Sequence, residues 1–300
     1  MAFVQQISLI VQKNSTLIYG TLCNGKESEK RKSHFFQVVN NYFQKPLINK
    51  PLIIEVGDQT VKCKTDENGF FTSTLEGQYH PIKKISLEES GEAVEIMQDY
   101  PTTFIEKDSN LAAISDIDDT IIVSHTAKNL KRIREILRRP SKRLTIDFSS
   151  DLLNKIASQG EVYYVSRSEV NLFPLLSSVI GMNDLPKGPL FMTKLVLGKR
   201  LLKPRKDPAH KKKSIQKILF GNNDKRFVLL GDDTQQDMHV YLEVAEEYPN
   251  RIKKIFIRKT GRVLSKDQRD CIKKLEMATV PFHYFNVTDD STQELNTLEL

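Results

Sequence analysis

The stretch "AAISDIDDTIIVS", Ala112 to Ser124, sets three aspartates, Asp116, Asp118 and Asp119, directly after an apolar run. The apolar run is typical of a buried strand, and a strand that ends here presents Asp116 and Asp118 at one edge of a sheet. Two carboxylates placed together repel each other and are costly to desolvate. A divalent cation removes both costs, and Mg²⁺ takes carboxylate, water and phosphate oxygens as ligands. The stretch therefore predicts a strand end that holds Mg²⁺ and a phosphate.

From about residue 109 the chain alternates strand-like and helix-like segments, which predicts a parallel sheet wrapped by helices, a Rossmann-like α/β fold. The expected strands are "LAAISDID", "EVYYVS", "RFVLLGDD" and "IKKIFIRK", at residues 111–118, 161–166, 226–233 and 252–259. The expected helices lie at residues 125–139, 149–160, 171–181, 211–222 and 237–249.

Residues 1 to about 105 are instead typical of β structure. Short β-branched or aromatic runs such as "STLIYGTLC" and "PLIIEVGD" are separated by turn signals such as "DENG", which predicts a small sandwich or barrel. An insertion at residues 24–50 contains a helix-like part, "HFFQVVNNYF". We therefore expect a β-sandwich-like domain at 1–108, an α/β domain at 109–288 and an acidic C-terminal tail at 289–300.

Composition limits the class of protein. The chain has 300 residues, 39% apolar and 28% charged, with a net charge of +7, as in a soluble globular protein with a weak preference for anionic partners. Its three cysteines have no disulfide or zinc spacing, which favours a reducing compartment. The first residues, "MAFVQQISLIVQKNS", lack the features of a signal peptide. We expect a cytoplasmic protein with possible peripheral contact at membranes.

Chemically reactive residues follow the predicted strands. Asp116 is placed to attack phosphorus as a nucleophile, and Asp118 to protonate the leaving oxygen and then activate water. Thr120 is expected to orient Asp118 through its hydroxyl. Ser166, after "VYYV", offers a hydroxyl to a phosphate. Because the carboxyl ends of the strands in an open α/β sheet meet in one crevice, we expect these residues to lie together.

A second acidic cluster, "GDDTQQD", and a basic helix start complete the pattern. Asp232, Asp233 and Asp237 are possible metal ligands, and of these we expect Asp233 to be solvated or to act behind the ligands. Lys211, Lys212 and Lys213 are adjacent, and any of them offers a positive charge to a phosphate, with Lys211 favoured by its spacing to Ile215. Asp119 is left between a capping residue and a local hydrogen-bonding partner.

These residues carry a family resemblance. "DIDDT", Ser166, Lys211 and "GDDTQQD" resemble, in order, the four motifs of the haloacid dehalogenase-like phosphatases. "YYVSRSEVNLFPLL", "HKKKSIQKIL" and "FVLLGDDTQQDMHVY" are similar to the actin-patch-associated phosphatidate phosphatase family. The resemblance is good over residues 110–259 and looser over the N-terminal part.

The resemblance implies a haloacid dehalogenase-type sheet with a small cap. It implies that Asp116 is the nucleophile and Asp118 the general acid and base. Mg²⁺ would be held by the Asp116 carboxylate, the Asp118 backbone carbonyl and the Asp232 carboxylate, with Asp237 acting through a metal-bound water. The implied reaction converts phosphatidate to diacylglycerol and phosphate through an aspartyl-phosphate.

Two departures from the family pattern concern substrate choice. The second motif reads Ser166-Arg167-Ser168-Glu169 where the family commonly has Ser-Asn-Ser-Pro, and the fourth reads Gly-Asp-Asp-Thr where the family has Gly-Asp-Ser-Gly. The first alternative is therefore a soluble phosphomonoester, such as a sugar phosphate or a nucleotide, hydrolysed by the same mechanism.

Two basic segments suggest a further partner. Residues 128–143 and 199–213 each carry eight Lys or Arg against one acid, and most such runs are solvated surfaces. Because both flank the predicted site, they are also suited to anionic membranes. The second alternative is a non-catalytic module that binds anionic membranes. No nucleic acid is expected, because no nucleic-acid-binding module or aromatic interleaving is visible.

Overall fold

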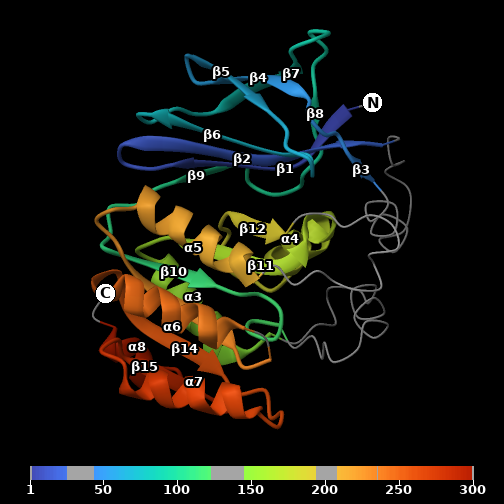
Figure 1. Cartoon of the computed structure of the whole chain (residues 1–300). Helices are drawn as coiled ribbons and strands as arrows, with labels where there is room; N and C mark the ends of the chain where they lie inside the picture. The colour runs from blue at the N-terminus through green and yellow to red at the C-terminus, as the bar shows by residue number, and fades with distance from the viewer. Residues whose placement is uncertain (1, 26–43, 123–144, 194–207, 235, 299–300) are drawn as a thin grey trace.

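The computed structural model describes residues 2–25, 44–122, 145–193, 208–234 and 236–298. Within these ranges the chain forms two N-terminal β-sheets and a larger α/β unit below them in Figure 1. Four expectations lie outside the described residues: the helical part of the first insertion, the helix at 125–139 together with the cap, the basic segment 128–143, and residues 199–207 of the second basic segment.

The α/β unit is built on a six-stranded sheet in which every neighbouring pair is parallel, in the order β12-β11-β10-β13-β14-β15. The strands are β10 (Leu111–Ser115), β11 (Val162–Glu169), β12 (Leu190–Thr193), β13 (Arg226–Asp232), β14 (Ile252–Arg258) and β15 (Phe282–Phe285). This confirms the predicted parallel sheet and all four predicted strands.

Helices cover both faces of this sheet. One apolar cluster joins the sheet to α3 (Asp147–Ala157) and α4 (Phe173–Met182). A second cluster joins the opposite face to α5 (Pro208–Gly221), α6 (Asp237–Glu247) and α7 (Lys266–Met277), which cross the near face in Figure 1. Because both faces are buried, the strands are apolar runs rather than alternating ones: all five residues of β10 are buried.

The strand order places a crevice beside the opening stretch. After β10 the chain continues to β11 and β12 on one side, and after β13 it continues to β14 and β15 on the other. β10 and β13 are therefore the neighbours at which the winding reverses, and ligands of open α/β sheets bind outside the carboxyl ends of such a pair. Asp116 and Asp232 both lie at this point.

The N-terminal part consists of two sheets that share one apolar core. The six-stranded sheet contains β1 (Ala2–Val11), β2 (Ser15–Asn24), β3 (Lys45–Pro46), β6 (Phe70–Glu76), β8 (Glu95–Ile96) and β9 (Thr103–Ile105). The three-stranded sheet contains β4 (Pro51–Val56), β5 (Gln59–Lys64) and β7 (Ile82–Leu87). Nine of the ten residues of β1 are buried, so this strand is covered on both faces.

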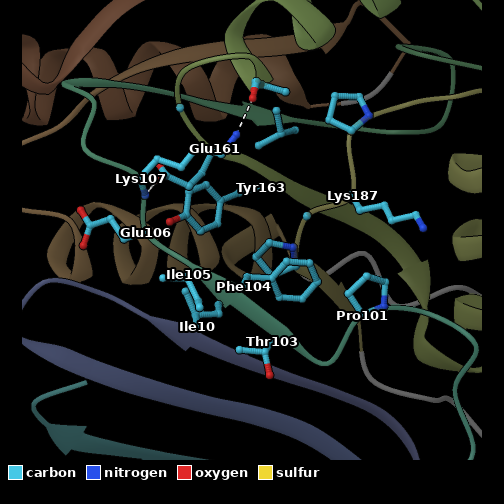
Figure 2. Close-up of a pocket in the computed structure, with 16 residues that line it drawn as sticks. Ile10, Pro101, Thr103, Phe104, Ile105, Glu106, Lys107, Glu161, Tyr163 and Lys187 are labelled. Carbon is cyan, nitrogen blue, oxygen red and sulfur yellow. Dashed lines mark hydrogen bonds between the residues drawn. The ribbon is translucent and has the colours of Figure 1, made fainter. Parts of the chain in front are cut away.

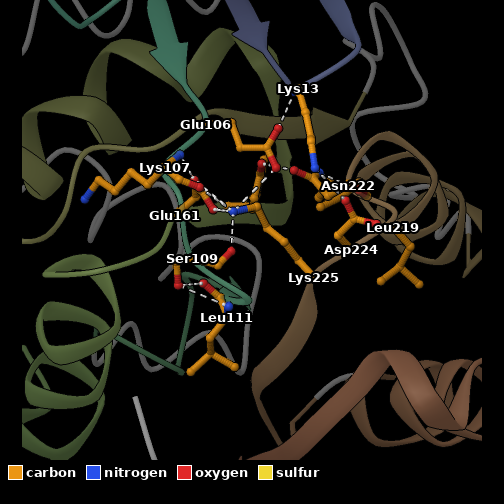
Figure 3. A network of polar contacts seen from close by, with 12 residues as sticks. Lys13, Glu106, Lys107, Ser109, Leu111, Glu161, Leu219, Asn222, Asp224 and Lys225 are labelled. Carbon is orange, nitrogen blue, oxygen red and sulfur yellow. Dashed lines mark hydrogen bonds and ion pairs between the residues drawn. The ribbon is translucent and has the colours of Figure 1, made fainter.

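The N-terminal part packs on the α/β unit through polar side chains of β1 and of the segment between β8 and β9. Gln6 Nε2 donates to the carbonyl of Leu190 at 2.5 Å, and Tyr100 Oη donates to the carbonyl of Gly188 at 3.0 Å. A buried lysine, Lys225, joins the two parts by pairing with Glu106 and Glu161 (Figure 3). These contacts satisfy polar groups that burial would otherwise penalise.

A hollow of about 270 Å³ lies at this junction (Figure 2). Phe104, Glu106 and Lys107 line it from β9 and the segment that follows, and Tyr163 and Lys187 line it from the start of β11 and from the loop before β12. It is therefore at the amino ends of the strands, the edge of the sheet opposite Asp116 and Asp232.

The expected acidic tail, residues 289–300, is described up to residue 298. Thr292–Thr297 form a short helix, α8. Leu298 is buried in the core beside α3, and Ser291 Oγ donates to Asp151 at 3.0 Å. Apolar packing and this hydrogen bond therefore attach residues 291–298 to the α/β unit.

Candidate active site

Three buried carboxylates and a lysine meet at the carboxyl ends of β10 and β13. Ligand oxygens of Asp116, Asp232 and Asp237 all lie within 4.8 Å of one another. Lys211 Nζ is 3.2 Å from Asp116 Oδ1 and 2.6 Å from Asp237 Oδ1. All four side chains are almost fully buried. The structure thus brings together four of the residues that the sequence singled out.

Local structure explains how these side chains converge. The backbone of Asp116 is held against β13, because its N–H donates to the carbonyl of Leu230 at 2.9 Å. Asp237 and Lys211 lie in the first turns of α6 and α5. Gly231 is required by close packing, because a Cβ at this position would lie 2.7 Å from both Asp237 Oδ2 and the ring of Tyr241.

Burial dominates the electrostatics of the cluster. Desolvation raises the pKa of Asp116, Lys211 lowers it, and the other carboxylates raise it further, so that it lies well above its usual value. Desolvation and Asp237 likewise raise the pKa of Asp232 to about 7. For Lys211, desolvation lowers the pKa, but the fields of Asp116 and Asp237 offset this and leave it raised. The ammonium is thus held in its charged form.

The donor set fits a hard divalent cation. Asp116 Oδ2 and Asp237 Oδ2 are buried, and neither has a hydrogen-bond partner among the described residues. Buried carboxylate oxygens without partners are costly. Mg²⁺ prefers such oxygens, and a cation between Asp116, Asp232 and Asp237 would satisfy both of them.

The prediction that Thr120 orients Asp118 is wrong. Thr120 Oγ1 donates instead to Asp232 Oδ2 at 3.3 Å. The reason is the left-handed backbone of Asp119, whose φ is 59°, which turns the chain before Thr120. The partner of Asp118 is Ser168, whose Oγ donates to Asp118 Oδ2 at 2.7 Å. Sequence reasoning assigned Ser168 no role, although its position two residues after Ser166 was a signal.

The structure separates the three adjacent lysines. Lys211 is buried in the carboxylate cluster, whereas Lys212 forms partly exposed ion pairs with Glu243 and Glu247 on α6. Lys213 is exposed. Ser166 is buried at the end of the same crevice, where its Oγ accepts a hydrogen bond from the Ser168 N–H at 3.0 Å.

The two remaining aspartates support the loops rather than the cluster. Asp233 is buried and accepts hydrogen bonds from Tyr284 Oη at 2.7 Å and from the Thr260 N–H, so the solvated alternative is wrong. Asp119 Oδ2 lies 3.7 Å from Arg262 Nη2. Arg258, which sequence reasoning did not single out, donates to the Asp119 carbonyl at 2.5 Å. The Asp119 N–H also donates to the Ile122 carbonyl at 2.9 Å, so Asp119 has a local hydrogen bond and is held in addition by two arginines that are distant in the sequence.

A family model described as the catalytic domain of phosphatidate phosphatase APP1 matches residues 111–259, from the first residue of β10 to just past β14. This segment belongs to the APP1 catalytic-domain family. The match contains each of the predicted site residues, Asp116, Asp118, Thr120, Ser166, Lys211, Asp232 and Asp237.

Two curated proteins are also similar to the chain. Phosphatidate phosphatase APP1 of Saccharomyces cerevisiae is 28% identical over 258 residues, which cover 77% of this chain and 43% of the yeast protein. An uncharacterized protein of Schizosaccharomyces pombe is 29% identical over 154 residues, which cover 50% of this chain and 25% of that protein. The chain spans less than half the length of these relatives.

Solved structures show weaker similarity. The Pnkp1/Rnl/Hen1 complex aligns at 14% identity with a TM-score of 0.35, covering 71% of this chain and 55% of that one. A carbohydrate acetylesterase of Xanthomonas citri aligns at 8% identity with a TM-score of 0.32, and the alignment covers 97% of this chain and 73% of the esterase chain. None of the described helices of the present chain is both long and apolar enough to cross a bilayer.

Proposed function

We propose that the chain is a Mg²⁺-dependent phosphatase of the haloacid dehalogenase-like superfamily that hydrolyses phosphatidate to diacylglycerol and phosphate. One observation carries the proposal: Lys211 bridges Asp116 and Asp237 beside Asp232, in a buried cluster at the reversal of the strand order. A cluster of this kind binds a cation and an anionic phosphate together and leaves one carboxylate as a nucleophile.

In the proposed reaction Asp116 attacks phosphorus. A carboxylate oxygen of Asp116 forms a bond to phosphorus while the bond to the ester oxygen breaks, which gives an aspartyl-phosphate. The ammonium of Lys211 and the hydroxyl of Ser166 hold the phosphate oxygens. Asp116, Asp232 and the Asp118 carbonyl would hold Mg²⁺, with Asp237 beside them, and the bound cation would offset negative charge on the phosphate oxygens.

Asp118 moves the protons. It gives a proton to the departing ester oxygen, and it then takes a proton from the water that cleaves the aspartyl-phosphate. The two proton transfers need a carboxyl group that lies beside the carboxylate cluster without being part of it. Asp118 fits because its side chain is half-buried and bonds to Ser168.

Phosphatidate is the proposed substrate because the matched family model and the yeast relative are described as phosphatidate phosphatase. A lipid substrate also implies work at a membrane surface. We therefore propose a cytoplasmic protein that contacts anionic membranes peripherally through the basic segments 128–143 and 199–213.

Substrate comparison, mutation of Asp116 and vesicle binding test the proposal. Release of phosphate from phosphatidate in mixed micelles should exceed release from a panel of sugar phosphates and nucleotides, and chelation of Mg²⁺ should abolish it. A preference for a soluble ester would replace the lipid assignment with the first alternative.

Asp116→Asn should remove turnover while the circular dichroism spectrum stays unchanged, and an active Asp116→Asn protein would refute the mechanism. Binding to anionic vesicles without turnover of any ester would favour the non-catalytic module.

A further inference from the structure

Ser168 and Asp118 form a short, partly buried hydrogen bond at the edge of the carboxylate cluster. Ser168 Oγ donates to Asp118 Oδ2 at 2.7 Å, the normal length for a hydroxyl and a carboxylate. Ser168 is 2% exposed. Its hydroxyl is therefore well shielded from water, which would otherwise compete with Asp118 for its proton.

The two partners lie in different local structures. Ser168 lies near the end of β11, where Thr193 Oγ1 donates to the preceding carbonyl, that of Arg167, at 3.1 Å. The Ser168 N–H donates to Ser166 Oγ at 3.0 Å. Asp118, in contrast, lies beyond the end of β10, in the turn that leads to the left-handed Asp119. The Ser168 hydroxyl, on a strand segment held by these two hydrogen bonds, is thus offered to a carboxylate on a turn.

We propose that Ser168 is a positioning residue that holds Asp118 for proton transfer to the leaving group, an inference that rests on the proposed function. Its hydroxyl engages Oδ2, so that Oδ1 is the oxygen left to carry the proton. As the bond from phosphorus to the ester oxygen breaks, the proton moves from Asp118 Oδ1 to that oxygen. Asp118 later recovers a proton from the attacking water, and the same hydrogen bond holds it in place.

If Ser168 positions Asp118, the effect of losing Ser168 on the rate should depend on the leaving group. The alcohol released from phosphatidate is an alkyl alcohol, a poor leaving group that needs a proton as it departs. The p-nitrophenolate ion is a good leaving group and departs without one. Loss of Ser168 should therefore slow the first step for phosphatidate far more than for p-nitrophenyl phosphate. A merely structural role would slow both equally.

The experiment compares Ser168→Ala with wild type in single turnovers, following release of the alcohol or phenol. We expect about 10- to 100-fold slower release from phosphatidate, since general acids contribute about 10²- to 10⁴-fold, and less than about threefold slower release of p-nitrophenol. In the steady state, kcat for phosphatidate should fall with KM unchanged. Ser168→Thr, which keeps a hydroxyl, should restore most of kcat.

Ser177→Ala is the matched control. Ser177 is a buried serine of α4 whose Oγ donates to the Pro174 carbonyl at 3.1 Å, so this variant removes a buried hydroxyl away from the cluster and should leave both rates unchanged. Equal losses on the two esters, a rise in KM alone, or no change with phosphatidate would each overturn the role of Ser168 while the proposed function stands. A wild-type protein that cleaves neither ester would overturn the proposed function, and this inference with it.

Discussion

Lys211 Nζ and Asp116 Oδ1 lie 3.2 Å apart in an ion pair from which water is almost excluded. Asp116 follows a central strand, and Lys211 belongs to a helix on one face of the sheet. Lys211 also contacts Asp237, so among the described residues one ammonium faces a cluster of three carboxylates. This imbalance of charge makes the cluster sensitive to loss of the lysine, to pH and to Mg²⁺.

Replacement of Lys211 should lower both stability and activity, whereas replacement of Lys212 should change neither. Lys211→Met removes a buried cation and leaves buried carboxylates unpaired, so unfolding free energy should fall by about 3–5 kcal/mol and phosphatase activity should be lost. Lys212→Met changes a partly exposed pair with Glu243 and Glu247 and should leave both quantities nearly unchanged. Urea titration and phosphate release measure the two effects. Equal effects of the two variants would contradict the assignment.

Stability of the metal-free protein should fall as pH rises from about 4 to about 7. Burial raises the pKa of Asp232 to about 7 in the folded state, against about 3.9 in the unfolded chain. Between these values the folded protein binds more protons than the unfolded one, so the unfolding free energy falls with pH, by at most about 4 kcal/mol from this group. Denaturation with a chelator present measures the slope, which Asp232→Asn should reduce. An unchanged slope in that variant would contradict the prediction.

Mg²⁺ should raise the melting temperature of the wild-type protein. A cation that binds only the folded state stabilises it by about 2.7 kcal/mol at 100 times its dissociation constant, and here it also satisfies the buried oxygens Asp116 Oδ2 and Asp237 Oδ2. In Asp237→Asn the increase should be smaller at the same Mg²⁺ concentration. Thermal scans of both proteins with and without Mg²⁺ test this, and an equal increase would exclude Asp237 from the metal site.

Asp233 and Tyr284 should be coupled energetically without sharing in the chemistry. Tyr284 Oη donates to Asp233 Oδ2 at 2.7 Å and ties the end of β13 to β15. The variants Asp233→Asn and Tyr284→Phe should each lose stability, and the double variant should lose about 1 kcal/mol less than the sum, as expected for contacting residues. Denaturation of all four proteins measures the coupling. Additive losses would show that the bond contributes nothing.

Lys225 should support the fold without influencing catalysis. Its ammonium pairs with Glu106 and Glu161 while 2% exposed, at the sheet edge opposite the cluster (Figure 3). Lys225→Met should cost about 3–5 kcal/mol, because it leaves two carboxylates poorly solvated. The control Lys13→Met breaks an exposed pair with Asp224 and should cost less than about 1 kcal/mol. At a temperature where both variants are folded, kcat should equal the wild-type value, and a lower kcat would show that the two edges communicate.

Much of the fold was visible in the sequence because its strands are buried on both faces. Continuous apolar runs such as those of β10 and β13 therefore predicted strands, and the segments between them predicted helices. β12 and β15 were missed: β12 has only four residues, and β15 reads "FHYF", which has no clear alternation. The acidic composition of residues 289–300 gave no sign that Leu298 packs into the apolar core.

By itself, the sequence determined which residues end the central strands, and therefore that Asp116, Asp118, Ser166 and Asp232 lie at one edge of a parallel sheet. Only the tertiary structure decided which of these groups touch. It assigned Lys211 rather than its neighbours to the cluster, gave Thr120 to Asp232, and paired Asp118 with Ser168. The point at which an apolar run ends locates the end of the strand, and therefore the edge of the sheet at which a side chain lies. Contacts of about 3 Å depend on helix rotation and on single backbone turns such as that at Asp119, which no local pattern encodes.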